Sequence, residues 1–387
     1  MRIISTKFSN FVGIHNLKKP IINNDNNVET ITHIPVLAKE ITKILSPKDG
    51  QFFLDLTFGG GGHTKYLLST NKKITIFTLD RDHQAFERAV LLAKKIEQNN
   101  CGQKIVPLLG RFSQMNGLLQ KIAIPYHSFD GAIIDLGASS FQYDDPVRGF
   151  SFRDGPLDMR MDGDRNPQMP SAADVINTLN ADELARIFKV YGEERNAKKI
   201  AQTIVDSRFL MKRINTTREL AEMVQSIVTN ANISRDKIGR TTHPATKIFQ
   251  ALRIFVNNEL NELNHVIPVL SRYLKISKPE SYNEDDDNGM IANERHNGGL
   301  LAIIAFHSLE DKIIKSHFVD QAGNNLMLPP KSDDYIIHPN NNYADQTKRL
   351  KIWKFYQKKF QVPTEEEILQ NPRARSAKLR LGLRINH

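Results

Sequence analysis

Four consecutive glycines, Gly59–Gly62, follow an apolar run at residues 52–58 and constrain the fold of this chain more than any other feature. A second apolar run, at residues 74–79, ends in the acidic residue Asp80. A strand, a glycine turn, a helix, a second strand and an acid are typical of an open α/β sheet that binds a nucleoside. Glycine lets the backbone approach the ligand, and the acid accepts hydrogen bonds from ribose hydroxyls.

The rest of the chain agrees with an α/β fold. Five apolar runs bounded by turn residues predict buried, mainly parallel strands. Predicted helices alternate with the first of these strands, which is the order of a βαβ series. The predicted strands are 52–56, 74–79, 105–109, 132–136 and 300–306, and the predicted helices are 33–45, 64–68 and 84–96.

An all-helical block interrupts this series. Residues 171–233 carry helix signals without a good strand, including capping boxes that begin at Asn180 and Thr216. Residues 245–266 have apolar side chains at helical spacing, which predicts one long amphipathic helix with its stripe in the core. We therefore expect an α/β domain in two parts, 33–150 and 243–387, with a helical domain inserted at 151–242.

Composition excludes several classes of protein. No stretch of the 387 residues approaches the ~20 apolar residues of a membrane helix. The single cysteine, Cys101, excludes an internal disulfide and a thiolate metal cluster and favours a reducing compartment. His63, His243 and His307 lack the spacing of metal ligands, so we predict no metal site.

The net charge of +10 indicates a polyanionic partner, with nucleic acid as the first candidate. Residues 347–360 contain six cations, four aromatic residues and no acid, and the tail from Asn371 contains five cations and no acid. Because cations reach phosphates and aromatic rings stack on bases, this composition predicts a surface for single-stranded RNA. A solvated helix whose aromatic side chains face the core would have the same composition.

Two segments are expected to lie outside the folded domains. The first 24 residues contain four cations and no acid, interspersed with hydroxyl and apolar residues. This composition predicts a mitochondrial targeting segment within residues 1–32, and the alternative is a disordered N-terminus without a targeting role. Residues 277–299 are polar and include four consecutive acids, which predicts an exposed, disordered acidic loop.

The candidate chemistry gathers where predicted strands end. Asp135 ends a buried strand and is expected to share a crevice with Asp80, for which capping of the following helix is an alternative role. Residues 142–162 mix both charges with Phe, Met and Gly, which predicts an active-site loop. His307 follows the last predicted strand and could act as a base, whereas Ser308 lacks the surroundings of a nucleophile.

The glycine run alone does not identify the ligand. Thr64 stands where G-x-G-x-x-G requires its third glycine, which disfavours a dinucleotide dehydrogenase. A smaller ligand such as S-adenosylmethionine needs only the turn and the close approach of the backbone.

Together these motifs resemble the small-subunit rRNA cytosine-N4 methyltransferase family (RsmH, also called MraW), in particular its mitochondrial members. The similarity covers almost the whole chain from His33 onward, and the string RGFSFRDGPLDMRMD at residues 148–162 is highly specific. Residues 1–32 and 277–299 lie outside the pattern. The other matching strings are at 33–37, 55–63, 79–82, 135–140, 191–195, 243–246, 249–253, 306–311 and 371–376.

The resemblance implies a Rossmann-like class I methyltransferase fold, with a mainly parallel sheet and an inserted all-helical domain that helps to hold RNA. It implies S-adenosylmethionine as cofactor and small-subunit rRNA as partner, free or within an assembling subunit, in the mitochondrial matrix. No membrane contact is expected, and monomer and homodimer both stay open. The cofactor contacts that it implies are Gly61, Gly62, His63, Asp80, Phe112, Asp135 and Gln142.

The amino group of cytosine is a poor nucleophile because its lone pair is delocalised into the ring. We expect Asp135 to be catalytic, accepting an N–H bond or the released proton, with backbone carbonyls or His307 assisting. The target base must be unpaired to fit. Three other classes share parts of the pattern: a nicotinamide oxidoreductase, a DNA cytosine methyltransferase and a non-catalytic RNA-binding or assembly factor.

Overall fold

The computed structural model describes residues 35–210, 213–228, 243–277, 298–319, 352–357 and 359–385. The chain divides into two units, Met1–Thr32 and His33–His387, and the described residues all belong to the second. The predicted targeting segment and nearly all of the predicted acidic loop therefore lie outside the described residues. Within the described ranges, no helix has the length and apolarity needed to cross a membrane.

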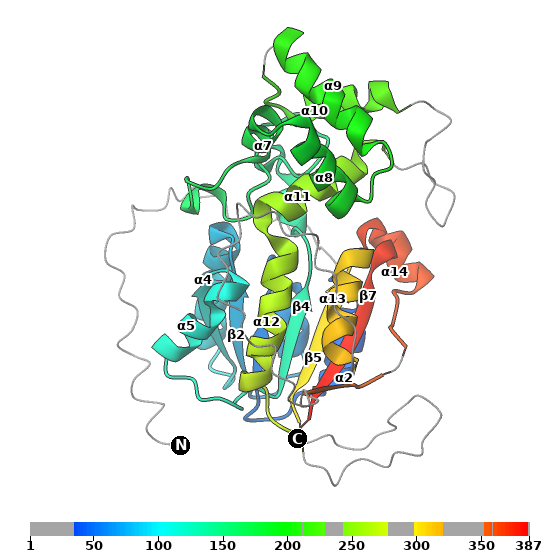
Figure 1. Ribbon diagram of the computed structural model, residues 1–387. Coiled ribbons are helices and arrows are strands. Elements are labelled where there is room, and N and C mark those ends of the chain that lie inside the picture. The colour runs from blue at the N-terminus through cyan, green and yellow to red at the C-terminus, as the bar shows by residue number, and fades with distance from the viewer. Residues whose placement is uncertain are drawn as a thin grey trace. The chain divides into compact units, whose positions relative to one another are not determined.

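A seven-stranded sheet with the order β3-β2-β1-β4-β5-β7-β6 forms the centre of the second unit (Figure 1). Strands β1 to β5 run parallel, β7 is antiparallel to β5, and β6 is antiparallel to β7. All five predicted strands are confirmed, each within one residue at its ends, and so is the Rossmann-like fold class. The strands are β1 (Phe52–Asp55), β2 (Thr75–Asp80), β3 (Lys104–Leu109), β4 (Gly131–Asp135), β5 (Leu300–Ala305), β6 (Trp353–Phe355) and β7 (Lys378–Arg384).

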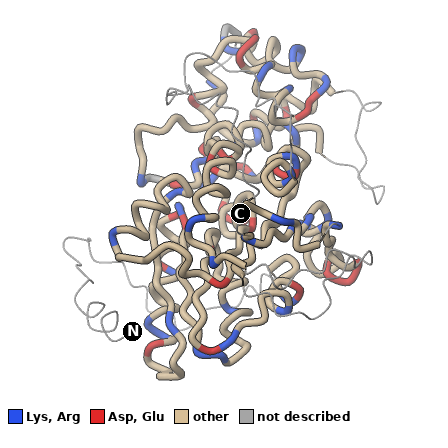
Figure 2. The backbone as a smooth tube through the Cα atoms, turned by 60° about the horizontal axis from the view of Figure 1, so that its bottom comes forward, with Lys and Arg blue, Asp and Glu red and all other residues tan. Residues whose placement is uncertain are grey.

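The two C-terminal strands come from the basic segments in which the sequence analysis expected no strand. Residues 353–355 form strand β6, so the alternative of a solvated helix is wrong there, although Trp353 is only 4% exposed and its ring faces the core as that alternative expected. In β7, buried leucines alternate with polar residues, and the side chain of Arg380 is buried against Asp311. Lysines and arginines therefore do not all lie on the surface, and Figure 2 shows their positions along the backbone interspersed with those of acids.

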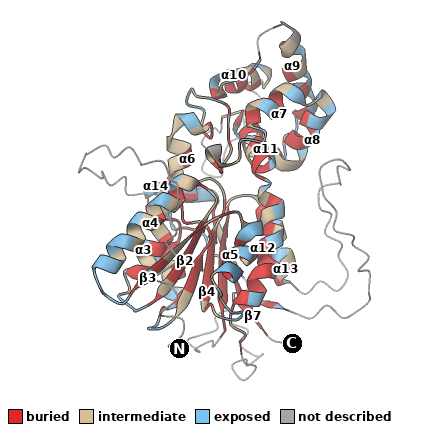
Figure 3. Cartoon of the chain, turned by 90° about the vertical axis from the view of Figure 1, so that its left-hand side faces the viewer, coloured by how far each residue is buried: buried red, intermediate tan, exposed pale blue. Residues whose placement is uncertain are grey.

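Helices cover both faces of the sheet. Adjacent residues of β1 alternate between the faces, because Phe53 and Leu54 belong to different hydrophobic clusters. Figure 3 shows the strands as a buried layer between helices whose outer surfaces are exposed. One face packs against α5 (Met115–Lys121), α12 (Glu259–Tyr273) and α13 (Ser308–Phe318), and the other against α2 (Ala38–Leu45), α3 (Gly62–Leu68) and α4 (His83–Gln98).

A separate hydrophobic cluster holds the helical block together. The predicted capping boxes are confirmed, because Asn180 and Thr216 are the N-caps of α8 and α10. The domain boundaries stay a prediction, and the cluster itself includes residues from Phe150 to Val256. In the structure the block extends beyond residues 171–233, because α11 shares its cluster. Its helices are α7 (Ala172–Thr178), α8 (Ala181–Gly192), α9 (Ala197–Leu210), α10 (Thr217–Ile227) and α11 (Thr246–Asn257).

The prediction of one continuous helix over residues 245–266 is wrong. Helix α11 ends at Asn257, Asn258 has a φ of 54°, and α12 begins at Glu259. The Asn257 side chain accepts a hydrogen bond from Met161 N at 2.8 Å and donates one to Met159 O at 2.7 Å. Contacts with a segment almost a hundred residues earlier therefore accompany the break, and no local spacing pattern reveals them.

The buried pair of Arg380 and Asp311 predicts a large effect on stability. Asp311→Ala leaves the Arg380 guanidinium, whose side chain is 4% exposed, without its carboxylate. We expect the free energy of unfolding to fall by about 3–5 kcal/mol, measured by urea denaturation. Lys315→Ala removes a half-exposed partner of the same carboxylate and is the matched control, with an expected loss of ~0–1 kcal/mol. Equal losses for the two variants would contradict the account.

Candidate active site

Three parallel strands that lie side by side each end in an aspartate. Asp55 ends β1, Asp80 ends β2 and Asp135 ends β4, and β1 lies between the other two strands. From β1 the chain continues to β2 and β3 on one side, and then crosses to β4 and β5 on the other side. Open α/β sheets bind their ligands where the strand order reverses in this way, here between β1 and β4. The structure thus brings the predicted residues Asp80 and Asp135 to one edge of the sheet and adds Asp55.

Asp80 holds the glycine turn against the end of β2. Its carboxylate accepts hydrogen bonds from Gly59 N and Asp82 N, both at 2.8 Å. Burial raises the pKa of Asp80 to about 6, although both N–H groups favour the ionised form. The alternative in which Asp80 caps the next helix is wrong, because the N-cap of α4 is Asp82, which accepts from Gln84 N.

The glycine run requires glycine for two separate reasons. Gly61 has a φ of 75°, in the left-handed region, and a Cβ there would lie 2.7 Å from the ring of Phe58. Gly62 begins α3, and a Cβ there would lie 2.7 Å from Pro35 Cβ. The turn therefore packs tightly against Phe58 and Pro35, and a larger residue at either glycine must shift it.

His63 and Asp135 form a buried pair with unused hydrogen-bonding capacity. His63 Nε2 lies 3.5 Å from Asp135 Oδ2, and His63 is 5% exposed. Within the described structure, His63 Nδ1 and Asp135 Oδ1 have no partner, and His63 Nε2 faces Asp135 Oδ2. Burial by itself lowers the pKa of His63, but the contact with Asp135 and the charges of Asp135 and Asp55 outweigh it and raise the pKa.

Buried polar atoms without a partner are uncommon in native structures. Two of them, His63 Nδ1 and Asp135 Oδ1, at the ligand-binding edge of an α/β sheet fit a site whose ligand supplies the missing partners. Asp55 is already satisfied by Thr64 Oγ1 at 2.7 Å, and Thr57 Oγ1 accepts from Asp135 N at 2.7 Å. The neighbouring side chains therefore fix the backbone around Asp135 and leave one of its carboxylate oxygens available.

The last two predicted cofactor contacts lie farther along the same edge. Phe112 follows β3, opens a short 3-10 helix (Phe112–Gln114) and packs partly buried against the sheet core. Gln142 lies in α6 (Ser140–Asp144) and is 4% exposed. Its Nε2 donates to Asp82 Oδ2 at 2.9 Å and its Oε1 accepts from Ser139 N at 2.9 Å. The Gln142 amide is thus held in place by protein groups.

His307 is engaged by its own helix. As the N-cap of α13 its Nδ1 accepts from Glu310 N at 3.4 Å, and its Nε2 lies 2.9 Å from Glu310 Oε1. Burial raises the pKa of Glu310, but His307 and Arg253 outweigh this effect and lower it. His307 therefore has an anionic partner at the end of β5.

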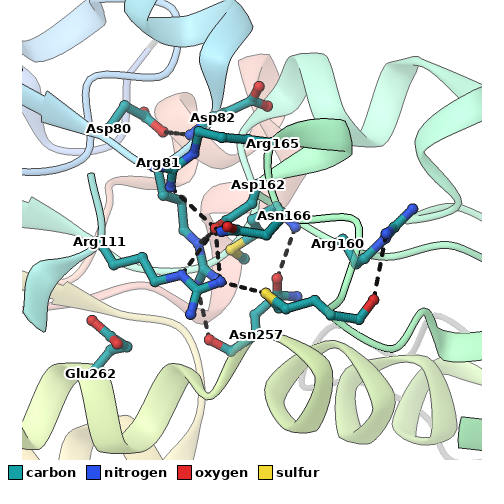
Figure 4. Close-up of polar contacts among 12 residues, drawn as sticks. Asp80, Arg81, Asp82, Arg111, Arg160, Asp162, Arg165, Asn166, Asn257 and Glu262 are labelled. Carbon is teal, nitrogen blue, oxygen red and sulfur yellow. Dashed lines mark hydrogen bonds and ion pairs between the residues drawn. The ribbon is translucent and has the colours of Figure 1, made fainter. Parts of the chain in front are cut away.

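The sequence analysis pointed to the loop at 142–162 but not to Asp162, whose carboxylate is the centre of its contacts. Arg81 and Arg111 both bind this carboxylate, the latter through Nε at 2.9 Å, and Arg165 lies 3.1 Å away (Figure 4). Arg81 follows Asp80 directly and Arg111 precedes Phe112 directly. One buried acid thus links the loop to the ends of β2 and β3.

Arg148 makes a second connection between the loop and the sheet. Its Nη1 donates to Asp82 Oδ2 at 2.7 Å, and its Nη2 donates to Met161 O at 2.9 Å. Asp82 also accepts from Gln142, so the loop, α6 and the end of β2 share one carboxylate. No local motif indicates these partners, since they lie 60 or more residues from Asp82 in sequence.

Comparison with known proteins gives a consistent family. A model of the MraW methylase family matches residues 30–278 and 290–385. The 12S rRNA N(4)-cytidine methyltransferase METTL15 of Homo sapiens is 40% identical, over 93% of this chain and 85% of its own. The ribosomal RNA small subunit methyltransferase H of Hyphomonas neptunium is 37% identical, over 92% of this chain and 89% of its own.

A longer relative contains the same region. In Culex quinquefasciatus, a chain named as the receptor-type tyrosine-protein phosphatase mosPTP-1 is 44% identical over 93% of this chain. This chain spans only 23% of that relative's length, so most of the phosphatase chain lies outside the region of similarity.

The environment of Asp162 predicts a pH-dependent contribution to stability. Burial raises the pKa of this carboxyl, but Arg81 and Arg111 outweigh burial and lower it below 3.8. A lowered pKa in the folded state stabilises the protein above the unfolded value of 3.8, and the stabilisation is lost as pH falls through the folded value. We expect Asp162→Asn to lower the free energy of unfolding by about 1–3 kcal/mol at pH 7, with a smaller difference from the unsubstituted protein below pH 3.8.

Asp154→Asn is the matched control for this experiment, since Asp154 forms an exposed ion pair with Arg218. Its expected effect is ~0–1 kcal/mol. Urea denaturation of both variants across this pH range measures the difference. If Asp162→Asn unfolds at the same midpoint as Asp154→Asn, the buried carboxylate does not connect the loop to the sheet as described.

Proposed function

The chain belongs to the MraW methylase family, and we propose that it transfers a methyl group from S-adenosylmethionine to N4 of a cytidine in small-subunit rRNA. The relatives named as rRNA cytidine methyltransferases support the reaction, at 37–40% identity over most of both chains. The single observation that carries the proposal is the edge of the sheet where Asp55, Asp80 and Asp135 end adjacent strands beside the glycine turn.

The residues of this edge fit the cofactor. We propose that the backbone of Gly61 and Gly62 allows the close approach of the cofactor, and that the Asp80 carboxylate accepts hydrogen bonds from its ribose hydroxyls. The unpaired atoms of His63 and Asp135 can receive polar groups of the ligand, and Phe112 can pack against its adenine. Gln142 holds Asp82 at the end of β2. When bound, S-adenosylmethionine supplies an electrophilic methyl group on a sulfonium.

Asp135 is the residue that we assign to catalysis. Within the described residues its Oδ1 has no partner, so it can accept an N–H bond from the cytosine amino group and localise the nitrogen lone pair. Bound S-adenosylmethionine would supply the methyl group and be left as the neutral thioether, while the Asp135 carboxylate would accept the proton that N4 loses and release it to solvent. The Thr57 hydroxyl accepts from Asp135 N and fixes the backbone of this residue. Alignment of the amino group with the methyl group in the site would lower the barrier by roughly 7–11 kcal/mol.

We assign RNA binding to the helical block and to the basic C-terminal region. The C-terminal region offers Phe360, which is 43% exposed with Lys378 and Arg380 each 5.2 Å from its ring centroid. Aromatic rings beside cations suit single-stranded RNA, whose bases stack and whose phosphates attract positive charge. The target cytosine must leave any helical stack to reach Asp135.

We place the protein in the mitochondrial matrix. The acid-free composition of the first 24 residues supports import. The 12S rRNA in the names of animal relatives supports the same compartment, because 12S is the small-subunit rRNA of animal mitochondria. The substrate is then this rRNA, either free or within an assembling subunit.

Replacing the proposed acceptor tests the reaction directly. We expect Asp135→Ala to lower methyl transfer to small-subunit rRNA by about 10²–10⁴-fold, because the variant lacks the proton acceptor. Nucleoside mass spectrometry of the digested RNA measures N4-methylcytidine, and the unfolding midpoint checks the fold. A DNA oligonucleotide of the same sequence and a titration with NAD test the alternative enzyme classes. Near-normal turnover by the variant would refute the role of Asp135.

The glycine turn predicts an effect limited to the cofactor. We expect Gly61→Val to abolish binding of S-adenosylmethionine while binding of rRNA persists, because a Cβ at this φ meets the ring of Phe58. Isothermal titration measures the first affinity and fluorescence anisotropy the second. Gly117→Ala in α5 is the control, since a Cβ there meets nothing within 4 Å. Parallel loss of both affinities would instead indicate general unfolding.

A further inference from the structure

The helical block carries an aromatic stack that reaches the surface. The ring of Phe152 stacks on His243 with centroids 4.4 Å apart and planes inclined by 30°. It also meets the edge of Phe249, at 4.7 Å and 67°. Phe249 is 6% exposed and anchors the stack in the core, whereas Phe152 is 38% exposed. The core contacts therefore hold Phe152 without covering it.

The loop around Phe152 is rigidly supported. Thr217 Oγ1 donates to Arg153 O at 2.6 Å, and Thr217 N donates to Gly155 O at 2.9 Å. A Cβ on Gly155 would lie 2.1 Å from Pro146 O, so the backbone folds closely on itself. A ligand that contacts Phe152 therefore loses little affinity to ordering of the loop.

The surroundings of Phe152 suit a nucleotide. Its neighbour in the chain is the exposed Arg153, whose Nη1 donates to Asp144 O at 3.5 Å, so the same short segment presents an exposed ring and a cation. Burial lowers the pKa of His243, which favours the neutral imidazole and hence an aromatic stack without a charge. Bases stack on such rings while arginine reaches phosphate, and the chain as a whole has a net charge of +10.

The loop also connects Phe152 to the candidate active site. Arg148, four residues before Phe152, binds Asp82, and Asp82 N binds Asp80. We propose that Phe152, backed by His243, is the stacking platform for an unpaired RNA base that flanks the target cytidine. This proposal rests on the proposed function and adds a specific RNA contact to it.

Substitution of the ring tests the platform. We expect Phe152→Ala to raise the Kd for a single-stranded oligonucleotide spanning the target by about 5- to 150-fold, measured by fluorescence anisotropy. The Kd for S-adenosylmethionine, measured by titration calorimetry, stays unchanged. Phe152→Trp retains binding within about 3-fold, since indole stacks at least as well, and its fluorescence is quenched when the oligonucleotide binds.

Tyr126→Ala is the matched control. Tyr126 lies outside the helical block and the C-terminal region, is 50% exposed and packs against Tyr273. Its removal is expected to leave the RNA Kd unchanged. Equal weakening by both alanine variants would show a general effect of exposed apolar area and overturn the platform.

The outcomes separate the platform from the proposed function. If Phe152→Ala binds RNA normally while the unsubstituted protein forms N4-methylcytidine, the platform is wrong and the proposed function stands. If the unsubstituted protein forms none, the proposed function fails, yet weaker RNA binding by Phe152→Ala still supports the platform. A normal RNA Kd with methylation lost only on intact small subunits would assign Phe152 to a protein partner and overturn the platform.

Discussion

The buried carboxylate of Asp162 is the interaction on which the arrangement of the site depends. It is 1% exposed and binds Arg81 and Arg111, which adjoin Asp80 and Phe112 in the chain. A buried ion is stable only with partners that compensate its desolvation, so the loop must stay where the arginines reach it. This one acid therefore fixes the loop at residues 142–162 against the ends of β2 and β3.

The site contains two buried polar atoms that are free to meet a ligand, beside two aspartates that the protein itself pairs. Asp55 and Asp80 receive hydrogen bonds from the glycine turn and its flanks, which fixes the close backbone approach. Among the described residues, Asp135 Oδ1 and His63 Nδ1 lie at the same edge without partners. Because leaving buried polar atoms unpaired is destabilising, their presence is best explained by a polar ligand.

Local patterns predicted the parts of the structure that local forces determine. The parallel strands followed from apolar runs and the caps at Asn180 and Thr216 from side-chain spacing, and the glycine turn was found where its residues indicated it. The break after Asn257 and the burial of Arg380 were missed, since each depends on a partner more than 60 residues away. The same reason hid Asp162 among the many charges of its loop. Which of the predicted residues touch the cofactor stays a prediction.

The central claim is that this edge of the sheet methylates N4 of a cytidine in mitochondrial small-subunit rRNA. Mapping N4-methylcytidine in that rRNA, with and without the protein, tests it most directly. The account predicts one cytidine that carries the modification only when the protein is present. An unchanged map, or the loss of a different modified nucleoside, would contradict it.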